Sequence, residues 1–330
     1  MDCSRSLSKT VITPHSLLLL SSFCLFANFA AAFNFSTITF DQGYTPLFSD
    51  FNIIRSDDDK TVSLLLNRYS GSGFISSEYY NYGLFSAKIK LPSNYSAGIV
   101  VAFYTSNVDV FEKNHDELDF EFLGNIRGKP WRFQTNLYGN GSTSRGREER
   151  FYVDEVPIRE VIRNPAMGGD YPSKPMSLYA TIWDASTWAT SGGKYKVNYN
   201  FQPFVSDFTD LVLEGCTVDP IQQIPAAAAP CGRDTDALEA DDINTISAEG
   251  RKAMSWFRER YMYYSYCYDL MRYPVPPPEC VIVPAERHLF KDTGRLKEAL
   301  KIKFGRHQKH RRRGSRRGRR DAGGAAATSF

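Results

Sequence analysis

Apolar and polar residues alternate over short stretches along much of the chain, which is the pattern of β-strands with one buried face. The run at residues 97–104 is continuously apolar and has the length of a strand buried on both faces. Turn residues, such as Ser70-Gly71-Ser72-Gly73, separate these stretches. The predicted strands are residues 61–67, 82–91, 97–104, 131–137 and 176–183.

Other stretches interrupt this pattern. Residues 33–60 hold only short apolar pieces and are predicted to be irregular. Ala253, Trp256 and Phe257 have near-helical spacing, so residues 247–260 form the one predicted helix, and the aromatic stretch 261–268 is predicted to be a last strand. Many short strands with hardly any helix indicate an all-β fold, an antiparallel sandwich.

Charged and apolar residues alternate most strictly in the stretch His115 to Gly124. Successive strand side chains point to opposite faces, so Glu117, Asp119 and Glu121 share one face with His115, and the other face is largely apolar. Like charges on one strand face repel each other. Three carboxylates in this arrangement therefore require an explanation.

Three explanations were weighed. A solvated sheet face usually mixes acids with Lys, Thr and Ser, and this one has no cation apart from His115. A hard metal ion usually takes ligands from flexible loops with backbone carbonyls, which a regular strand does not supply. Retaining glycoside hydrolysis needs one carboxylate as nucleophile and a protonated one as general acid, roughly 5 to 5.5 Å apart. In that case we expect Asp119 to hydrogen-bond one Glu and to raise the pKa of a neighbour, with no metal or organic cofactor required.

The N-terminal segment, residues 1–32, has a basic start, an apolar run and a small-residue end at Ala30-Ala31-Ala32, which predicts a removable signal peptide. No second hydrophobic stretch follows, so a soluble secreted product is expected.

Two of the six cysteines lie in the predicted signal peptide, and the remaining four predict two disulfides whose pairing the spacing leaves open. Asn34, Asn94 and Asn140 begin sequences of the N-glycosylation type.

Charge is distributed unevenly along the chain, although the formal net charge is only +3. Residues 301–320 contain 11 Lys or Arg and no acid, whereas the rest of the secreted part is acidic. A run of like charge is normally disordered. Behind a signal peptide we interpret it as attraction to an anionic extracellular polymer, such as an acidic polysaccharide, rather than to nucleic acid or membrane.

Several motifs occur together in an order typical of one family. Residues 115–124 closely resemble the signature of plant xyloglucan endotransglucosylase/hydrolases, a branch of glycoside hydrolase family 16. The other landmarks are residues 70–74, 134–136, 188–193 and 277–280. The resemblance implies a β-jelly-roll sandwich with a small disulfide-stapled C-terminal extension. It also implies a secreted enzyme of the cell wall and apoplast that cuts and rejoins xyloglucan.

The resemblance also implies roles for single residues. Glu117 is expected to be the nucleophile, Glu121 the acid/base and Asp119 the residue that supports them. A xyloglucan donor and a xyloglucan oligosaccharide acceptor are the expected partners. The implied disulfides are Cys216–Cys231 and Cys267–Cys280. The implied glucan-binding residues are Gln134, Thr135, Asn136, Gly146, Arg147, Glu148, Thr187, Trp188, Gly192 and Arg272. Trp183 and Trp188 could each stack on a sugar or only cap the core.

The sequence departs from the family pattern in three places. Asn125-Ile126-Arg127 lacks the hydroxyl residue of a glycosylation sequence found there in many members, and Gln134 stands where many have His. After residues 147–151, Val153-Asp154 follows almost at once, so about two strands and a turn, on the order of 20 to 25 residues, are predicted to be absent. The predicted organisation is a signal peptide (1–32), a jelly-roll domain (33–214) with this deletion near 151–152, an extension (215–284) and a basic disordered tail (285–330).

Two rival functions follow from these features. Loss of paired strands would expose sheet edges and open the core, which leaves a catalytically impaired, glucan-binding wall protein as an alternative. A second rival is an interaction protein that acts through its basic tail and uses the sandwich as a carrier. The balance between transfer and hydrolysis stays open.

Overall fold

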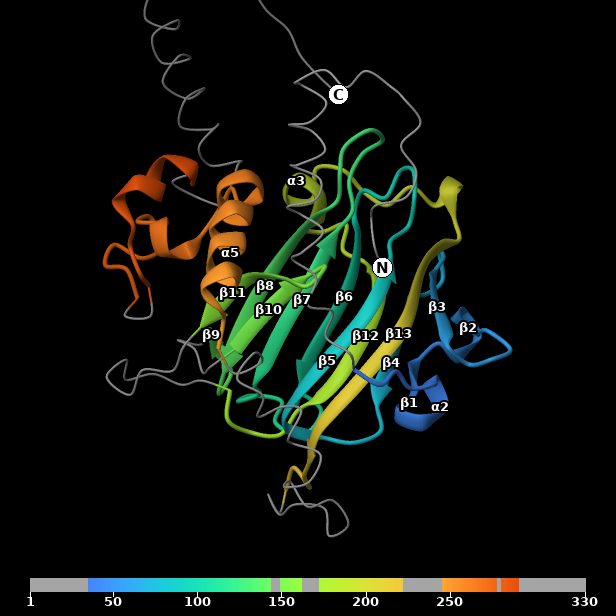
Figure 1. Ribbon diagram of the computed structural model, residues 1–330. Coiled ribbons are helices and arrows are strands. Elements are labelled where there is room, and N and C mark those ends of the chain that lie inside the picture. Colours follow the sequence, from blue (N-terminus) through green and yellow to red (C-terminus); the bar gives the residue numbers. More distant parts are fainter. Residues whose placement is uncertain (1–34, 144–148, 162–171, 222–244, 278–279, 291–330) are drawn as a thin grey trace, which may run out of the picture.

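The computed structural model describes residues 35–143, 149–161, 172–221, 245–277 and 280–290. Two antiparallel sheets are stacked face to face in it (Figure 1). The larger sheet has the order β1 (Tyr44–Phe48), β4 (Ser72–Ser76), β12 (Ser177–Asp184), β6 (Ile99–Ser106), β7 (Glu117–Leu123), β8 (Arg132–Gly139) and β9 (Ser142–Thr143). The smaller sheet has the order β2 (Ile53–Arg55), β3 (Thr61–Leu66), β13 (Phe204–Thr217) and β5 (Tyr80–Lys90). The predicted all-β antiparallel sandwich is confirmed.

The predicted strands and the helix α5 (Ala248–Tyr261) lie within a few residues of their expected positions. The prediction for residues 33–60 was wrong, because they form α2 (Phe40–Gly43), the 3-10 helix η1 (Asp50–Asn52) and strands β1 and β2. These strands exist through pairing with β4 and β3, which a local pattern does not reveal.

The prediction of a last strand at residues 261–268 was also wrong, since this stretch ends α5 and continues without strand to the 3-10 helix η4 (Tyr266–Tyr268). Its aromatic side chains each contact a different part of the structure, and within the described ranges the backbone does not pair with another strand. The Arg132 guanidinium lies 5.3 Å from the ring centre of Tyr263, and the ring centres of Tyr268 and Phe290 are 4.6 Å apart.

The main core lies between the two sheets, and its buried residues are at most 3% exposed. Phe74 stands at its centre, with its ring edge-on to those of Phe40, Tyr44 and Phe208 at centroid distances of 5.5, 5.1 and 5.5 Å. The main core comprises Phe40, Tyr44, Val62, Leu64, Leu66, Phe74, Ile99, Val101, Leu178, Ala180, Ile182, Phe204, Phe208 and Leu211. Its close packing joins the two sheets into one body.

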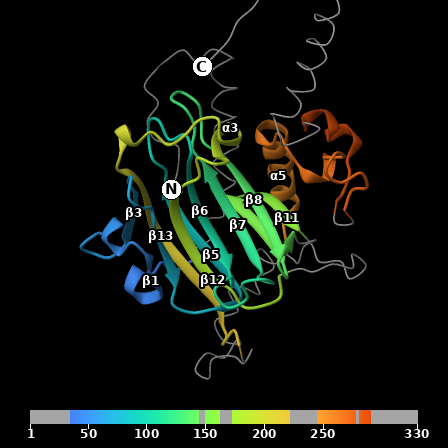
Figure 2. The ribbon, with the colours of Figure 1, turned by 180° about the vertical axis from the view of Figure 1, so that it is seen from behind.

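A hairpin of β10 (Glu149–Val153) and β11 (Val156–Val161) covers the apolar side of β7 and β8. Within the described ranges, β10 and β11 pair only with each other. The hairpin forms the rear core, which consists of buried Leu137, Phe151, Ile158 and Val161 with half-buried Leu118, Phe120, Phe133, Val153 and Phe257. Helix α5 contacts β11, and both ribbon views place it beside β8 and β11 (Figures 1 and 2).

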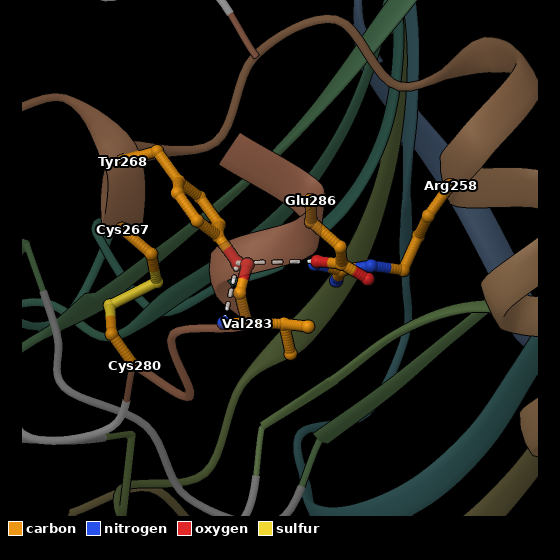
Figure 3. The surroundings of a disulfide bond; sticks show 6 residues. All are labelled: Arg258, Cys267, Tyr268, Cys280, Val283 and Glu286. Carbon is orange, nitrogen blue, oxygen red and sulfur yellow. Dashed lines mark hydrogen bonds and ion pairs between the residues drawn. A yellow bond between two sulfur atoms is a disulfide. The ribbon is translucent and has the colours of Figure 1, made fainter. Parts of the chain in front are cut away.

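The C-terminal extension is held together by a disulfide and a polar cluster (Figure 3). Cys267 and Cys280 are bonded, which confirms one predicted pair. The Tyr268 hydroxyl accepts from the Val283 amide at 3.0 Å and donates to Glu286 at 3.2 Å, and Arg258 of α5 donates to the same carboxylate at 3.0 Å. Cys216 is also disulfide-bonded, but its predicted partner Cys231 lies outside the described residues.

The tail was predicted to be disordered from residue 285, which is corrected by the 3-10 helix η5 (Pro284–Leu289). Contacts of Glu286 with Tyr268 and Arg258 hold this turn against the extension. The predicted signal peptide and the run of basic residues fall outside the described residues. No helix in the described ranges is long and apolar enough to span a bilayer.

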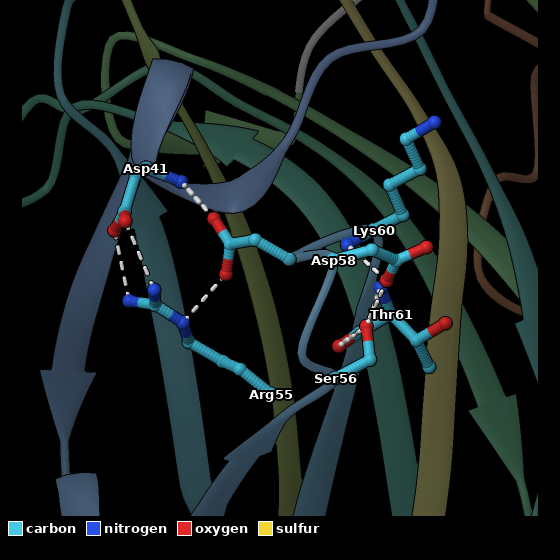
Figure 4. A network of polar contacts seen from close by, with 7 residues as sticks. Asp41, Arg55, Ser56, Asp58, Lys60 and Thr61 are labelled. Atoms are coloured by element: carbon cyan, nitrogen blue, oxygen red, sulfur yellow. Dashed lines mark hydrogen bonds and ion pairs between the residues drawn. The ribbon is translucent and has the colours of Figure 1, made fainter.

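A polar network ties α2 to β2 at the other end of the sandwich (Figure 4). Arg55 donates to both carboxylate oxygens of Asp41, at 2.8 and 2.9 Å, and its Nε lies 2.6 Å from Asp59. Its guanidinium also lies 5.1 Å from the ring centre of Phe40. This network lies against Phe40 of the main core, and its strand β2 is an edge strand of the smaller sheet, whereas β7 belongs to the larger sheet.

Candidate active site

The alternation along β7 sorts its side chains as predicted. Leu118 and Phe120 belong to the rear core, so Glu117, Asp119 and Glu121 point to the opposite side of the sheet, which we call the carboxylate face. The register sets a partner on β8 beside each acid: Tyr138 beside Glu117, Asn136 beside Asp119 and Gln134 beside Glu121.

Glu121 is held by two side-chain amides from β8. Gln134 Nε2 donates to Glu121 Oε2 at 2.6 Å, and Asn136 Nδ2 donates to the same oxygen at 2.9 Å. These two donors fix the orientation of the Glu121 carboxyl group. The sequence-based expectation that Gln134 and Asn136 lie at this site agrees with their position.

Asp119 is the most buried of the three acids, with 6% of its surface exposed. Burial, followed by the charges of Glu117 and Glu121, raises the pKa of Asp119 to about 8, although a hydrogen bond from Asn136 opposes the shift. A hydrogen bond to Glu117 adds to the rise. At neutral pH Asp119 therefore keeps a proton, which removes one negative charge from the row. The sequence had suggested a raised pKa for a neighbour of Asp119, and the structure places such a shift on Asp119 itself.

Glu117 lies between an imidazole and the phenol of its cross-strand partner. His115 Nε2 is 4.0 Å from Glu117 Oε2, and the ring centres of His115 and Tyr138 are 6.2 Å apart. Burial, then the charges of Asp119 and Glu117, raise the pKa of Tyr138, while the positive charge of Arg272 opposes that rise. The expected nucleophile thus has the His115 imidazole at its side, and Arg272 of the extension acts electrostatically on its cross-strand partner Tyr138.

Tyr104 extends the carboxylate face onto β6, where it is the partner of Asp119. Its ring stacks on Tyr179 of β12 at a centroid distance of 5.0 Å and an angle of 13°. Burial, followed by the charges of Glu117 and Asp119, raises the pKa of Tyr104, so its hydroxyl stays protonated beside the acids. Sequence reasoning missed Tyr104 because it ends a continuously apolar run in which no alternation separates the two faces.

Asp116 anchors the start of β7 and was also missed from the sequence. It is fully buried, and its Oδ2 accepts from the amides of Ser173 and Lys174 at 2.7 and 2.8 Å. Its Oδ1 accepts from the Asn140 amide and from Lys174 Nζ, both at 2.8 Å. One carboxylate therefore ties β7 to the turn after β8 and to the segment before β12. Asp116 stands close to three other acidic residues in the sequence, so residue type alone did not indicate that it has a structural role.

Thr135 does not lie with the other expected glucan-binding residues of β8. It is the cross-strand partner of Phe120, so its side chain is on the rear-core side, where Arg159 of β11 donates to its hydroxyl at 2.9 Å. Only every second residue of a strand can face the acids, and a contiguous motif on a strand cannot contribute all its side chains to one face.

Two tryptophans, one near the end of β12 and one after it, lie at the edge of the carboxylate face. Trp183 is in register with Val100 and, through it, with Leu123, two residues from Glu121 on the same face. It packs over a small cluster of Val100, Ala102, Ala185 and Ala189. Trp188 is 38% exposed, with its ring centre 5.9 Å from that of Trp183. Trp183 thus caps apolar residues, and Trp188 offers a ring to solvent.

The remaining expected binding residues are more distant from the acids in the chain. Thr187 and Gly192 are exposed near the short helix α3 (Ala189–Gly193). Arg272 is exposed, with its guanidinium 5.3 Å from the ring centre of Tyr273. Gly146, Arg147 and Glu148 lie outside the described residues.

Comparison with known proteins decides the family. The sequence profile for glycosyl hydrolases family 16 matches residues 40–150 and 147–201, and the profile for the xyloglucan endo-transglycosylase C-terminus matches residues 234–280. The probable xyloglucan endotransglucosylase/hydrolase protein 30 of Arabidopsis thaliana is 57% identical over 330 residues, with 93% of each chain covered. The chain belongs to the xyloglucan endotransglucosylase/hydrolase family. The predicted family membership is confirmed.

A second plant relative and a solved structure are also similar to this chain. The probable xyloglucan endotransglucosylase/hydrolase protein 29 of Arabidopsis thaliana is 57% identical over 298 residues, covering 80% of this chain and 83% of its own. A prokaryotic β-1,3-1,4-glucanase (lichenase) from a mouse hindgut metagenome is similar with a TM-score of 0.39 and 18% identity, covering 55% of this chain and 98% of its own. As a member of the xyloglucan endotransglucosylase/hydrolase family, the chain is an enzyme of the glycosyl hydrolase class.

Proposed function

We propose that this chain cuts and rejoins xyloglucan by a retaining double displacement, with Glu117 as nucleophile and Glu121 as acid/base. One observation carries the assignment of residues: the two acids share a strand face, and a buried, protonated Asp119 stands between them. The names of the relatives, which describe xyloglucan endotransglucosylase/hydrolases, support the substrate.

In the proposed reaction, the Glu117 carboxylate attacks the anomeric carbon while Glu121 gives its proton to the leaving glycosidic oxygen. A covalent glycosyl-enzyme results, and the cut glucan end departs. Glu121 then removes a proton from the 4-hydroxyl of another glucan end or from water, which releases Glu117. The neutral Asp119 limits repulsion among the acids and hydrogen-bonds to Glu117, and its proton is not consumed.

Several features support a role outside the cell. We propose a xyloglucan donor and a xyloglucan oligosaccharide acceptor as partners, and the cell wall and apoplast as the location. The predicted signal peptide and the disulfides fit an oxidising compartment. Asn94 and Asn140, two of the predicted glycosylation positions, have exposed side chains. The basic run after residue 300 is proposed to bind an anionic wall polysaccharide.

We also propose that about two strands are absent between residues 150 and 153. The two family-16 matches meet at residues 147–150, and β10 and β11 are separate from the smaller sheet in the described ranges. The impaired, binding-only alternative is not favoured, because Glu117, Glu121 and the amides that hold Glu121 are all in place. We retain the proposed limits of 33–214 for the catalytic domain and 215–284 for the extension.

A transfer assay tests the proposal. Residues 33–330, secreted through an oxidising pathway, would be mixed with xyloglucan and a labelled xyloglucan oligosaccharide. We expect label in the polymer, and a loss of about 10³-fold or more in Glu117→Ala and Glu121→Ala, since each removes a group of the reaction. Binding of xyloglucan without label transfer, unchanged in Glu117→Gln, would contradict the proposed activity and establish a binding protein.

A further inference from the structure

We propose that Arg159 is a positioning residue for the acid/base Glu121, acting from the rear side of the sheet through Thr135; this inference rests on the proposed function. Arg159 belongs to the hairpin and does not reach the carboxylate face. It nevertheless sets the position of the strand segment from which both amide donors of Glu121 project.

The contact is made at the centre of that segment. One guanidinium nitrogen of Arg159, NH1, donates to the Thr135 carbonyl at 3.1 Å and to the Thr135 hydroxyl at 2.9 Å. Gln134 and Asn136, on either side of Thr135, point to the other face and donate to Glu121 Oε2 at 2.6 and 2.9 Å. A shift of the Thr135 backbone therefore moves both donors together.

The segment needs such support because it lies at a sheet edge. Strand β9 pairs with β8 only at Tyr138 and Gly139, and in the described part of the chain no strand pairs with the outer side of β8 at Thr135. An unpaired edge of a sheet is where a strand moves most freely. The charged donor of Arg159 occupies the carbonyl that a further strand would otherwise bind, and charge-assisted hydrogen bonds are stronger than neutral ones.

The guanidinium is itself held between two rings. Its central carbon lies 5.4 Å from the ring centre of Phe151 on β10 and 5.8 Å from that of Tyr266. Tyr266 precedes Cys267, whose disulfide closes the extension. The extension is thereby linked indirectly to β8: Tyr266 contacts Arg159, and Arg159 binds Thr135, the residue between the two amide donors of Glu121.

Two pairs of variants test the inference. Arg159→Met removes the donors and the charge, whereas Arg159→Lys keeps the charge and one donor. Thr135→Val removes the hydroxyl and keeps the shape, whereas Thr135→Ser keeps the hydroxyl. Arg251→Gln is the matched control, because Arg251 of α5 donates at 2.7 Å to Glu160, the neighbour of Arg159, rather than to β8.

We expect kcat of transfer to fall about tenfold in Arg159→Met and a few-fold in Thr135→Val, with KM changed less than about twofold, because displaced amides misplace the reacting carboxyl. Arg159→Lys and Thr135→Ser should recover most of the rate, and Arg251→Gln should keep the wild-type kcat and KM.

Hydrogen exchange of the amides at residues 132–139 gives a second measurement that needs no activity, and it should be faster in Arg159→Met than in Arg251→Gln. Unchanged kcat and unchanged exchange in a folded Arg159→Met would overturn the inference. Equal losses in Arg159→Met and Arg251→Gln would also overturn it, since they would indicate general loosening of the hairpin. An inactive wild type would refute the proposed function alone, because the exchange comparison would still decide whether Arg159 holds β8.

Discussion

The main core and the rear core bury apolar residues in different ways. The main core has a sheet on both sides and residues at most 3% exposed, whereas the rear core has buried residues of 4 to 6% exposure, several half-buried rings and a two-stranded hairpin as its cover. The carboxylate face stands on β7 and β8, directly above the rear core. The reaction is therefore placed over the less completely packed region, where single contacts have a larger share in holding the site.

The largest effect on stability should come from the main core. Phe208→Ala should lower the free energy of unfolding by about 3 to 5 kcal/mol, because Phe208 is fully buried and packs edge-on against Phe74. Phe151→Ala in the rear core should cost less, since the hairpin can relax around a smaller side chain. Denaturant unfolding of residues 33–330 measures both, and equal losses would remove the proposed difference between the two cores.

The Cys267–Cys280 disulfide should stabilise chiefly the rear core and the elements that cover it. Cys267→Ser with Cys280→Ser should lower the free energy of unfolding by about 2 to 4 kcal/mol, because the bond constrains the unfolded chain. Hydrogen exchange should become faster in α5 and in β10–β11 and stay unchanged in β3 and β13. A uniform acceleration over both regions would mean that the extension supports the whole sandwich.

The acid row should make stability depend on pH. Asp119 has a folded pKa of about 8, raised from an ordinary value near ~4, so between these values the native state keeps a proton that the unfolded chain releases. Stability is then highest at low pH and falls as pH rises toward 8, by up to about 1.4 kcal/mol per pH unit. Asp119→Asn cannot ionise, so its stability relative to wild type should increase from pH 4 to pH 8. Parallel curves in a thermal denaturation series would contradict the raised pKa.

The smallest effect is expected at the far edge of the main core. Arg55→Gln removes the exposed network with Asp41 and Asp59, and such surface ion pairs contribute about 1 kcal/mol or less. Transfer activity should not change, because β2 is an edge strand of the smaller sheet, whereas β7 belongs to the larger sheet. A clear loss of kcat would show that the two ends of the sandwich are coupled.

The sequence predicts the elements well where one local pattern dominates. The alternation in residues 117–123 identified β7, its two faces and the acids, and the helical spacing near Trp256 identified α5. Strands β1 and β2 could not be found, because their existence depends on partners far along the chain. The aromatic stretch 261–268 has strand propensity but lacks a neighbouring ladder, so ring packing determines its conformation.

Site residues follow the same rule. A motif on a strand indicates a location but not a direction, and for this reason Thr135 was expected beside the glucan while its hydroxyl is bound by Arg159 on the other side. Asp116 was passed over because burial, not residue type, distinguishes it from its acidic neighbours. The local sequence pattern reveals neither which strand another strand pairs with nor how deeply a carboxylate is buried.

The anchoring of Asp116 has a consequence for how the enzyme is made. Its carboxylate binds amides that lie 57 and 58 residues further along the chain, so these bonds form only after the intervening strands have returned to the larger sheet. Contacts between residues so far apart in the sequence form late, because the entropy cost of closing a long loop must be met before the contact stabilises the chain. We therefore expect the start of β7 to become ordered late in folding, so that a partly folded chain carries the acids before they are arranged for the reaction.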